Sequence, residues 1–223
     1  MVRPLLQPLR QIMARPAALY AKYKHATMIP PAVFRANIEL VCNYIQGYPP
    51  DAAVIECGCW RGGMSAALVE IGGPDRDYYF FDSFEGLPPA KDIDGPAALA
   101  YQADKTSPSY HNNCTASLEE FRATMASLDA RIYPVKGFFD KTFPSFDPPS
   151  VAVLRLDADW YDSTMLCLRK FWDHMVPKGL ILIDDYYTWD GCSRAVHDFL
   201  SERKAPERIS QKGEGLAYIV KDL

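Results

Sequence analysis

The chain has 223 residues, of which 48% are hydrophobic and 23% charged, and this composition fits one globular domain with a sizeable core. A formal net charge of -4 gives no bulk attraction to nucleic acid or to an anionic membrane surface. The sequence has no apolar run of the roughly 18 residues that a membrane span requires, and no unbroken apolar signal segment. We therefore expect a single domain over residues 1–223, a cytoplasmic location, and no nucleic-acid or membrane partner.

The start of the chain is basic. Six Lys or Arg residues and no Asp or Glu precede Glu39. A transit peptide would share this bias, but it would also be rich in Ser, and this stretch contains none. The favoured interpretation is a helical N-terminal arm, residues 1–30, that packs on the main domain.

Short apolar strands then alternate with helical patterns. In chain order the patterns predict helix 32–48, strand 52–57, helix 62–73, strand 77–82, helix 117–128, strand 131–137, strand 151–157, helix 162–175, strand 179–184, helix 191–203 and strand 215–221. Ser117 and Glu120 have the spacing of a capping box, and Pro134 suggests that its strand lies at an edge of the sheet. This order is typical of a doubly wound, largely parallel α/β sheet.

The segment 84–113 breaks the alternation. It is rich in Pro and shows no clear periodicity, and loops of this length are usually functional or disordered. Because it follows the second strand, we expect it to fold over the site as a lid that contacts the substrate.

Ligands bind such sheets outside the carboxyl ends of the strands. Five residues occupy these ends in the predicted sheet: Glu56, Asp82, Gly137, Asp157 and Asp184.

A glycine turn in VIECGCWRGGMS joins the first strand to a helix. Gly58 allows a sharp turn, and Gly62 and Gly63 let a ligand or backbone come close to the helix N-terminus. Trp60 stands where a dinucleotide fingerprint has the glycine that admits a pyrophosphate, which disfavours an NAD-dependent oxidoreductase. S-adenosyl-L-methionine needs no such gap, and Glu56 would meet its ammonium group directly or through water.

Two further segments favour a nucleoside ligand. Asp82 ends the second strand 24 residues after Gly58, at about the spacing where a carboxylate binds a ribose diol. Gly137 and Phe138 follow the third strand, where an adenine would lie against backbone and ring, although the aromatic pair there could equally belong to the core.

An acidic cluster follows the two strands 151–157 and 179–184. If these strands are neighbours, Asp157, Asp184 and Asp185 would meet one hard cation, and carboxylate ligands suit Mg²⁺ or Mn²⁺ rather than Zn²⁺. Asp159 is the candidate general base, acting on a hydroxyl whose acidity the metal raises. Asp162, in the sequence DST, is interpreted as the N-cap of the following helix.

The segments IECGCWRGG, FDSFEGLPP, VKGFFDKTFP, LRLDADWYDST and ILIDDYYTWDGCSRAV together resemble the macrocin/mycinamicin O-methyltransferase family, from about Thr27 to the C-terminus. The resemblance implies a Rossmann-like class I methyltransferase fold, with a seven-stranded, mostly parallel sheet, an antiparallel last strand beside 179–184 and helices on both faces. It also implies methylation of a sugar hydroxyl on a natural-product glycoside, in antibiotic or other secondary-metabolite biosynthesis. The implied cofactors are S-adenosyl-L-methionine and Mg²⁺, and the implied assembly is a homodimer or higher homo-oligomer.

The resemblance assigns roles to particular residues. It implies that Asp157, Asp184 and Asp185 bind the metal and that Asp159, together with Asp157, acts in catalysis. The residues implied around the cofactor are Thr27, Met28, Glu56, Cys57, Gly58, Cys59, Trp60, Asp82, Ser83, Gly137 and Phe138. The lid shows no recognisable match after Pro89, so the resemblance does not identify the acceptor.

Two other functions remain open. A catechol- or phenol-type O-methyltransferase would use the same metal chemistry on an aromatic diol. A non-catalytic nucleoside-binding module is disfavoured by the acidic residues, because a binding protein has no need of a cation at the strand ends.

Overall fold

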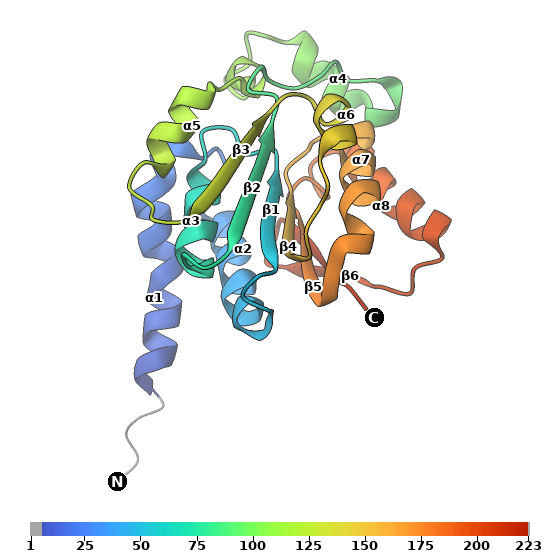
Figure 1. Ribbon diagram of the computed structural model, residues 1–223. Helices are drawn as coiled ribbons and strands as arrows, with labels where there is room; N and C mark the ends of the chain where they lie inside the picture. Colours follow the sequence, from blue (N-terminus) through green and yellow to red (C-terminus); the bar gives the residue numbers. More distant parts are fainter. Residues whose placement is uncertain (1–5, 223) are drawn as a thin grey trace.

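The structure, a computed structural model, describes residues 6–222, with side chains from residue 15 onward. Its centre is a seven-stranded sheet in the order β3-β2-β1-β4-β5-β7-β6 (Figure 1). The strands are β1 (Ala53–Cys57), β2 (Asp77–Asp82), β3 (Arg131–Lys136), β4 (Val151–Leu156), β5 (Met175–Ile183), β6 (Ile209–Lys212) and β7 (Leu216–Val220). Strands β1 to β5 are parallel, and β7 runs antiparallel to both β5 and β6. The predicted fold and the antiparallel last strand beside β5 are confirmed.

Helices cover both faces of the sheet. One layer contains α1 (Leu6–Tyr23), α2 (Pro31–Tyr44), α3 (Gly63–Gly72) and α5 (Leu118–Met125), and the other contains α6 (Phe139–Thr142), α7 (Tyr161–Phe171) and α8 (Asp190–Arg203) (Figure 1). Alternate residues of each central strand face opposite layers. Val54 and Leu180 belong to the core under the first layer, and Ile55 and Ile181 to the core under the second.

The N-terminal arm packs on the main domain, as predicted. Helix α1 contacts α2 and α3, and Leu19 and Tyr23 are buried there. Arg15 donates to the carbonyl oxygen of Glu70 on α3 at 2.6 Å. The part of the predicted arm at residues 1–5 lies outside the described residues. Between residues 6 and 222, no helix is both long and apolar enough to cross a membrane.

The lid, residues 84–113, contains a helix that the sequence did not predict. Helix α4 (Pro96–Ala103) begins with Pro96 at its first position, after Gly95, a favourable helix start. It lies at the top of the view in Figure 1, over the carboxyl ends of the strands. The expectation that this segment has no regular structure is wrong, and its role as a lid over the substrate stays a prediction.

The two edges of the sheet differ from its centre. Strand β3, which contains Pro134, lies at one edge, as predicted. Strand β6 lies at the other edge and was not predicted, because its four residues show no apolar alternation.

Candidate active site

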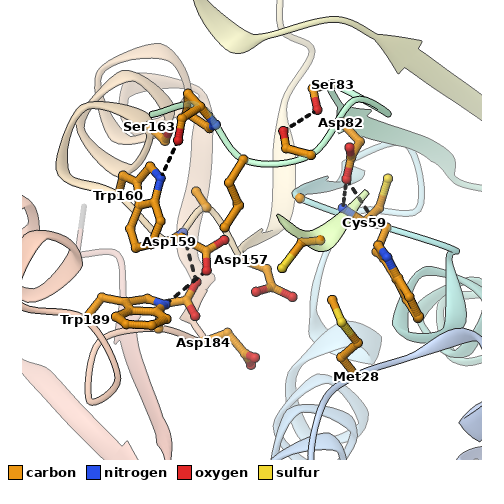
Figure 2. A pocket seen from close by; sticks show the side chains of 18 of the residues that line it. Met28, Cys59, Asp82, Ser83, Asp157, Asp159, Trp160, Ser163, Asp184 and Trp189 are labelled. Carbon is orange, nitrogen blue, oxygen red and sulfur yellow. Dashed lines mark hydrogen bonds between the residues drawn. The ribbon is translucent and has the colours of Figure 1, made fainter. Parts of the chain in front are cut away.

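A cavity of about 1060 Å³ opens between the lid and the carboxyl ends of the parallel strands. Most of the predicted site residues line it: Thr27, Met28, Glu56, Gly58, Cys59, Trp60, Asp82, Ser83, Phe138, Asp157, Asp159, Asp184 and Asp185. Figure 2 shows the cavity with two groups of labelled side chains facing each other: Asp157, Asp159, Asp184, Trp160 and Trp189 on one side, and Met28, Cys59 and Asp82 on the other.

Two predicted residues do not line the cavity. The Cys57 side chain is buried in the core beside Cys167. Gly137 donates its backbone N–H to the carbonyl oxygen of Asp82 at 2.9 Å, which joins the ends of β3 and β2. Their contribution to a ligand site stays a prediction.

Two glycines of the turn after β1 lie so close to other backbone segments that a side chain would not fit there. Gly58 has φ +85°, and a Cβ there would lie 1.7 Å from the carbonyl oxygen of Asp157 at the end of β4. A Cβ at Gly63 would lie 2.6 Å from the carbonyl oxygen of Ala26, just after α1. The turn is therefore packed against both β4 and the N-terminal segment that borders the cavity.

Asp82 holds this turn in place. Its carboxylate accepts hydrogen bonds from the backbone N–H groups of Cys59 at 2.9 Å, Trp60 at 2.8 Å and Phe84 at 2.7 Å. Burial raises the pKa of Asp82 despite these donors. If Asp82 also binds a ribose, as predicted, it would do so in addition to these three hydrogen bonds, which already order the turn.

A buried arginine, which sequence reasoning missed, lies between the predicted carboxylates. Arg155 on β4 is beside Glu56 in the strand register, and its Nη1 lies 2.7 Å from Glu56 and 3.0 Å from Asp157. Its Nη2 lies 2.9 Å from Asp184, and its Nε lies 3.3 Å from the amide oxygen of Asn37 on α2. Sequence signals existed, because Arg155 interrupts an apolar strand two residues before Asp157 and therefore faces the same side.

Burial and charge oppose each other in this network. Burial lowers the pKa of Arg155, but Asp184, Asp157 and Glu56 outweigh it, so the net pKa is raised and the guanidinium stays charged. Burial raises the pKa of Glu56 to about 7, against the opposing effect of Arg155. Both oxygens of Glu56 have partners, because Ser65 also donates its hydroxyl to this carboxylate. A ligand ammonium would therefore contact a Glu56 carboxylate that already binds Arg155 and Ser65.

Three carboxylates form a second group beside this network. Oxygen atoms of Asp157, Asp159 and Asp185 lie within 4.8 Å of one another. Burial raises the pKa of Asp157 to about 6, and burial together with neighbouring carboxylates raises the pKa of Asp159 and Asp185 well above the usual range. In the described part of the chain, no Lys or Arg forms an ion pair with Asp159 or Asp185. An oxygen donor set in which only Asp157 pairs with a protein cation fits a hard divalent cation.

Asp184, a predicted metal ligand, lies next to this group. Its Oδ1 accepts from the amide of Asn37 at 3.0 Å and contacts Arg155, so this oxygen already has two partners. The structure thus brings Asp157 and Asp185 together with Asp159, and attaches Asp184 to Arg155. The assignment of metal ligands stays a prediction.

Asp159, the candidate base, has its position fixed by two contacts. Its backbone adopts φ +56°, which is strained for a residue with a side chain. Its N–H donates to Asp185 at 3.0 Å, and the indole N–H of Trp189 donates to its carboxylate at 3.0 Å. Figure 2 shows this Trp189 contact at the side of the cavity. Trp189 was not identified from the sequence.

The lid is attached to the start of α7. Asp94 accepts from the backbone N–H of Tyr161 and from that of Lys91, both at 2.7 Å, and the Trp160 indole N–H donates to the carbonyl oxygen of Pro88 at 2.9 Å. The interpretation of Asp162 as the N-cap is wrong. Asp162 lies in the first turn of α7, Trp160 occupies the N-cap position, and Asp94 of the lid accepts from the free backbone N–H of Tyr161, the first residue of the helix.

The other end of the lid is a left-handed turn. All four residues from His111 to Cys114 have φ between 45° and 57°, which costs roughly 1–2 kcal/mol per residue. Asn113 stabilises the turn, because its amide donates to the carbonyl oxygen of Leu87 at 2.9 Å and its side-chain oxygen accepts from Gln102 at 3.0 Å. This turn places His111 at the cavity wall.

Known proteins are similar to this chain in sequence. A family model described as Macrocin-O-methyltransferase (TylF) matches residues 27–218. The 8-demethyl-8-(2,3-dimethoxy-alpha-L-rhamnosyl)-tetracenomycin-C 4'-O-methyltransferase of Streptomyces olivaceus is 33% identical over 172 residues, which are 74% of this chain and 63% of that protein. The mycinamicin III 3''-O-methyltransferase of Micromonospora griseorubida is 31% identical over 172 residues, which are 73% of this chain and 65% of that protein. The match therefore spans less than two thirds of the length of these relatives.

Solved structures agree with the fold. The O-methyltransferase NovP superposes with a TM-score of 0.74 at 20% identity, covering 97% of this chain and 98% of that chain. The calicheamicin methyltransferase CalS11 superposes with a TM-score of 0.59 at 20% identity, covering 98% of this chain and 94% of that chain. These likenesses confirm the Rossmann-like class I methyltransferase fold. Because the family model matches residues 27–218, nearly the whole described chain, the protein belongs to the macrocin O-methyltransferase family.

Proposed function

We propose that this chain is an S-adenosyl-L-methionine-dependent O-methyltransferase that acts, with Mg²⁺ or Mn²⁺, on a sugar hydroxyl of a natural-product glycoside. The observation that carries the proposal is the convergence of Asp157, Asp159 and Asp185 in the same cavity that the glycine turn and Asp82 line. A nucleoside-binding half and a cation-binding half within one cavity suit a transfer reaction between a bound donor and a bound hydroxyl.

The acceptor class is inferred from relatives. Two of them are named for O-methylation of a rhamnosyl-tetracenomycin and of mycinamicin III, and one solved neighbour is described as a TDP-rhamnose 3'-O-methyltransferase. A methyltransferase of the same fold from Podospora anserina, with a TM-score of 0.59, is described as bound to S-adenosylhomocysteine. These names support a glycoside acceptor and this cofactor for the present chain.

In the proposed cofactor half, the protein supplies an ordered turn and the cavity-lining segment that contains Met28. Asp82 fixes the amides of Cys59 and Trp60 at the cavity wall and would accept the ribose hydroxyls. Met28, which is 36% exposed although it lines the cavity, would be covered by the bound cofactor. S-adenosyl-L-methionine brings a methyl group already activated by its sulfonium, so the protein mainly has to align donor and acceptor.

In the acceptor half, the carboxylates would bind the cation and remove a proton. Asp157 and Asp185, with Asp184 beside them, would hold Mg²⁺ or Mn²⁺, and such a cation raises the acidity of a hydroxyl and orients it. Asp159 would accept the hydroxyl proton, with its carboxylate held by the Trp189 indole. We expect the protein to act as a homodimer or higher oligomer in the cytoplasm, and both remain predictions.

The first test is a calorimetric titration with S-adenosylhomocysteine, followed by turnover on a panel of glycosides and catechols with and without a chelator. We expect micromolar binding, and methyl transfer to glycosides only when a divalent cation is present. Asp159→Asn should abolish turnover but keep S-adenosylhomocysteine binding, whereas Asp173→Asn, at an exposed surface ion pair, should change neither.

Each alternative has its own outcome. Preference for catechols over glycosides would favour the catechol-type enzyme. Binding without turnover on any hydroxylated compound would favour a nucleoside-binding module. Full activity with chelator present would refute the dependence on a divalent cation. Absence of S-adenosylhomocysteine binding would refute the proposal as a whole.

A further inference from the structure

Arg155 contacts residues in both the proposed cofactor half and the proposed cation half of the cavity. Its side chain is 1% exposed and joins residues from four elements of the fold. Glu56 lies at the end of β1 before the glycine turn, Asp157 and Asp184 follow β4 and β5, and Asn37 comes from α2. Nη1 donates to Glu56 and Asp157, Nη2 makes an ion-pair contact with Asp184, and Nε donates to Asn37, so the positions of these side chains depend on one another.

The charges make this dependence strong. One buried positive charge is shared among three carboxylates, and a buried carboxylate without a partner is costly. A cation that attracts Asp157 weakens its pairing with Arg155, which leaves more of the guanidinium charge for Glu56 and Asp184. A ligand that orders Glu56 or the turn beside it acts on Asp157 through the same group.

We propose that Arg155 is a positioning residue that couples the cofactor half of the cavity to the cation half. The inference rests on the proposed function, because it takes the glycine-turn side as the cofactor site and the aspartate cluster as the cation site. Each ligand orders carboxylates that the other also needs, so the second ligand binds to an already ordered site and binds more tightly. Linkage requires the effect to be reciprocal.

Asn37 extends the unit to the N-terminal segment. Its amide donates to Asp184 at 3.0 Å and to the carbonyl oxygen of Val33 at 3.0 Å, while its oxygen accepts from Arg155. Helix α2 follows directly after the stretch of residues 27–30 that lines the cavity. The cation half is thereby connected to the segment 27–30, which contains Thr27 and Met28 of the proposed cofactor site.

The test measures coupling between two ligands rather than turnover. The dissociation constant of S-adenosylhomocysteine is measured by calorimetry with chelator and with saturating Mn²⁺, and that of Mn²⁺ with and without S-adenosylhomocysteine. In the unaltered protein we expect each ligand to tighten the other about fivefold or more, by the same factor. In Arg155→Lys the factor should fall toward one, because a single ammonium keeps the charge but cannot contact all partners of the fork.

Two further variants keep the test decisive. Arg131→Lys changes an exposed arginine on β3 that pairs with Asp77, and it should retain full coupling. Asn37→Leu keeps Arg155 but removes its Nε contact and the amide bond to Asp184, so it should lower the factor at least twofold. It decides the question if Arg155→Lys does not fold, as judged by circular dichroism.

The outcomes separate this inference from the proposed function. Unchanged coupling in folded Arg155→Lys, or in Asn37→Leu if the first does not fold, overturns the role of Arg155, and a lower melting temperature alone would then mark a purely structural arginine. Independent binding of both ligands to the unaltered protein overturns the inference but leaves the proposed function intact. Binding of neither ligand refutes the proposed function itself.

Discussion

The lid should lose its attachment to α7 when Asp94 is replaced by Ala. Asp94 is 2% exposed, and its two carboxylate oxygens accept backbone hydrogen bonds from Tyr161 and Lys91, both at 2.7 Å. Loss of a helix cap costs about 1 kcal/mol, and a hydrogen bond to a charged group contributes about 1.5–3 kcal/mol. We therefore expect Asp94→Ala to lower the free energy of unfolding by about 2–4 kcal/mol.

Thermal and urea unfolding measure this loss. For a chain of this length the melting temperature should fall by about 4–16 °C, with little change in the urea m-value. Asp92→Ala is the matched control, because Asp92 is an exposed acid in the same 3-10 turn. Asp94→Asn should lose about half as much, since its amide oxygen can still accept one of the two bonds. A loss below about 0.5 kcal/mol in Asp94→Ala, or an equal loss in Asp92→Ala, would refute the reasoning.

Three other variants or conditions test the site. Gly58→Ala should cost about 3 kcal/mol or more, because its methyl group would meet the Asp157 carbonyl oxygen 1.7 Å away at φ +85°, and a urea midpoint close to that of the unaltered protein would contradict this. Trp189→Phe removes the donor to Asp159 and should lower kcat about tenfold while changing S-adenosylhomocysteine affinity less than twofold; equal losses in both would count against it. In chelator, the raised pKa of Glu56, about 7 against a reference of 4.5, means that its stabilising contribution is complete below about pH 4.5 and is lost as pH rises through 7. The fall in melting temperature from pH 5.5 to 8 should therefore be smaller in Glu56→Gln, and an identical fall in both proteins would show that Glu56 does not titrate in this range.

Local patterns were enough to predict most of the sheet and its helices. The buried central strands β1 and β4 are apolar apart from Glu56 and Arg155, and the predicted capping box of α5 forms, with Glu120 N–H donating to Ser117 at 3.1 Å and Ser117 N–H donating to Glu120 at 2.8 Å. The site followed from topology, because the carboxyl ends of parallel strands meet at one edge of the sheet. Glu56, Asp82 and Asp157 were therefore placed in one cavity without knowledge of their contacts.

The features that were missed depend on contacts distant in sequence. The partners of Arg155 include Asn37, 118 residues away, and Glu56, 99 residues away, and only the register of β1 and β4 brings them together. Helix α4 buries Ala98 alone, so it has no apolar stripe for a periodicity argument to find. The acceptor at the start of α7 was assigned to the nearest acid in sequence, whereas in the structure Asp94, 67 residues away, accepts from the N–H of Tyr161.

The two edge strands limit how copies of this chain can associate. Joining two sheets edge to edge requires a continuous row of free backbone donors and acceptors. Pro134 has no N–H to offer, and the exposed Arg131 and Lys136 charge both ends of β3. At the opposite edge β6 has only four residues, and Lys212 at its end pairs with Glu39 at 3.1 Å. Any homo-oligomer should therefore form without joining two sheets edge to edge, and both edges are protected against the strand addition that leads to aggregation.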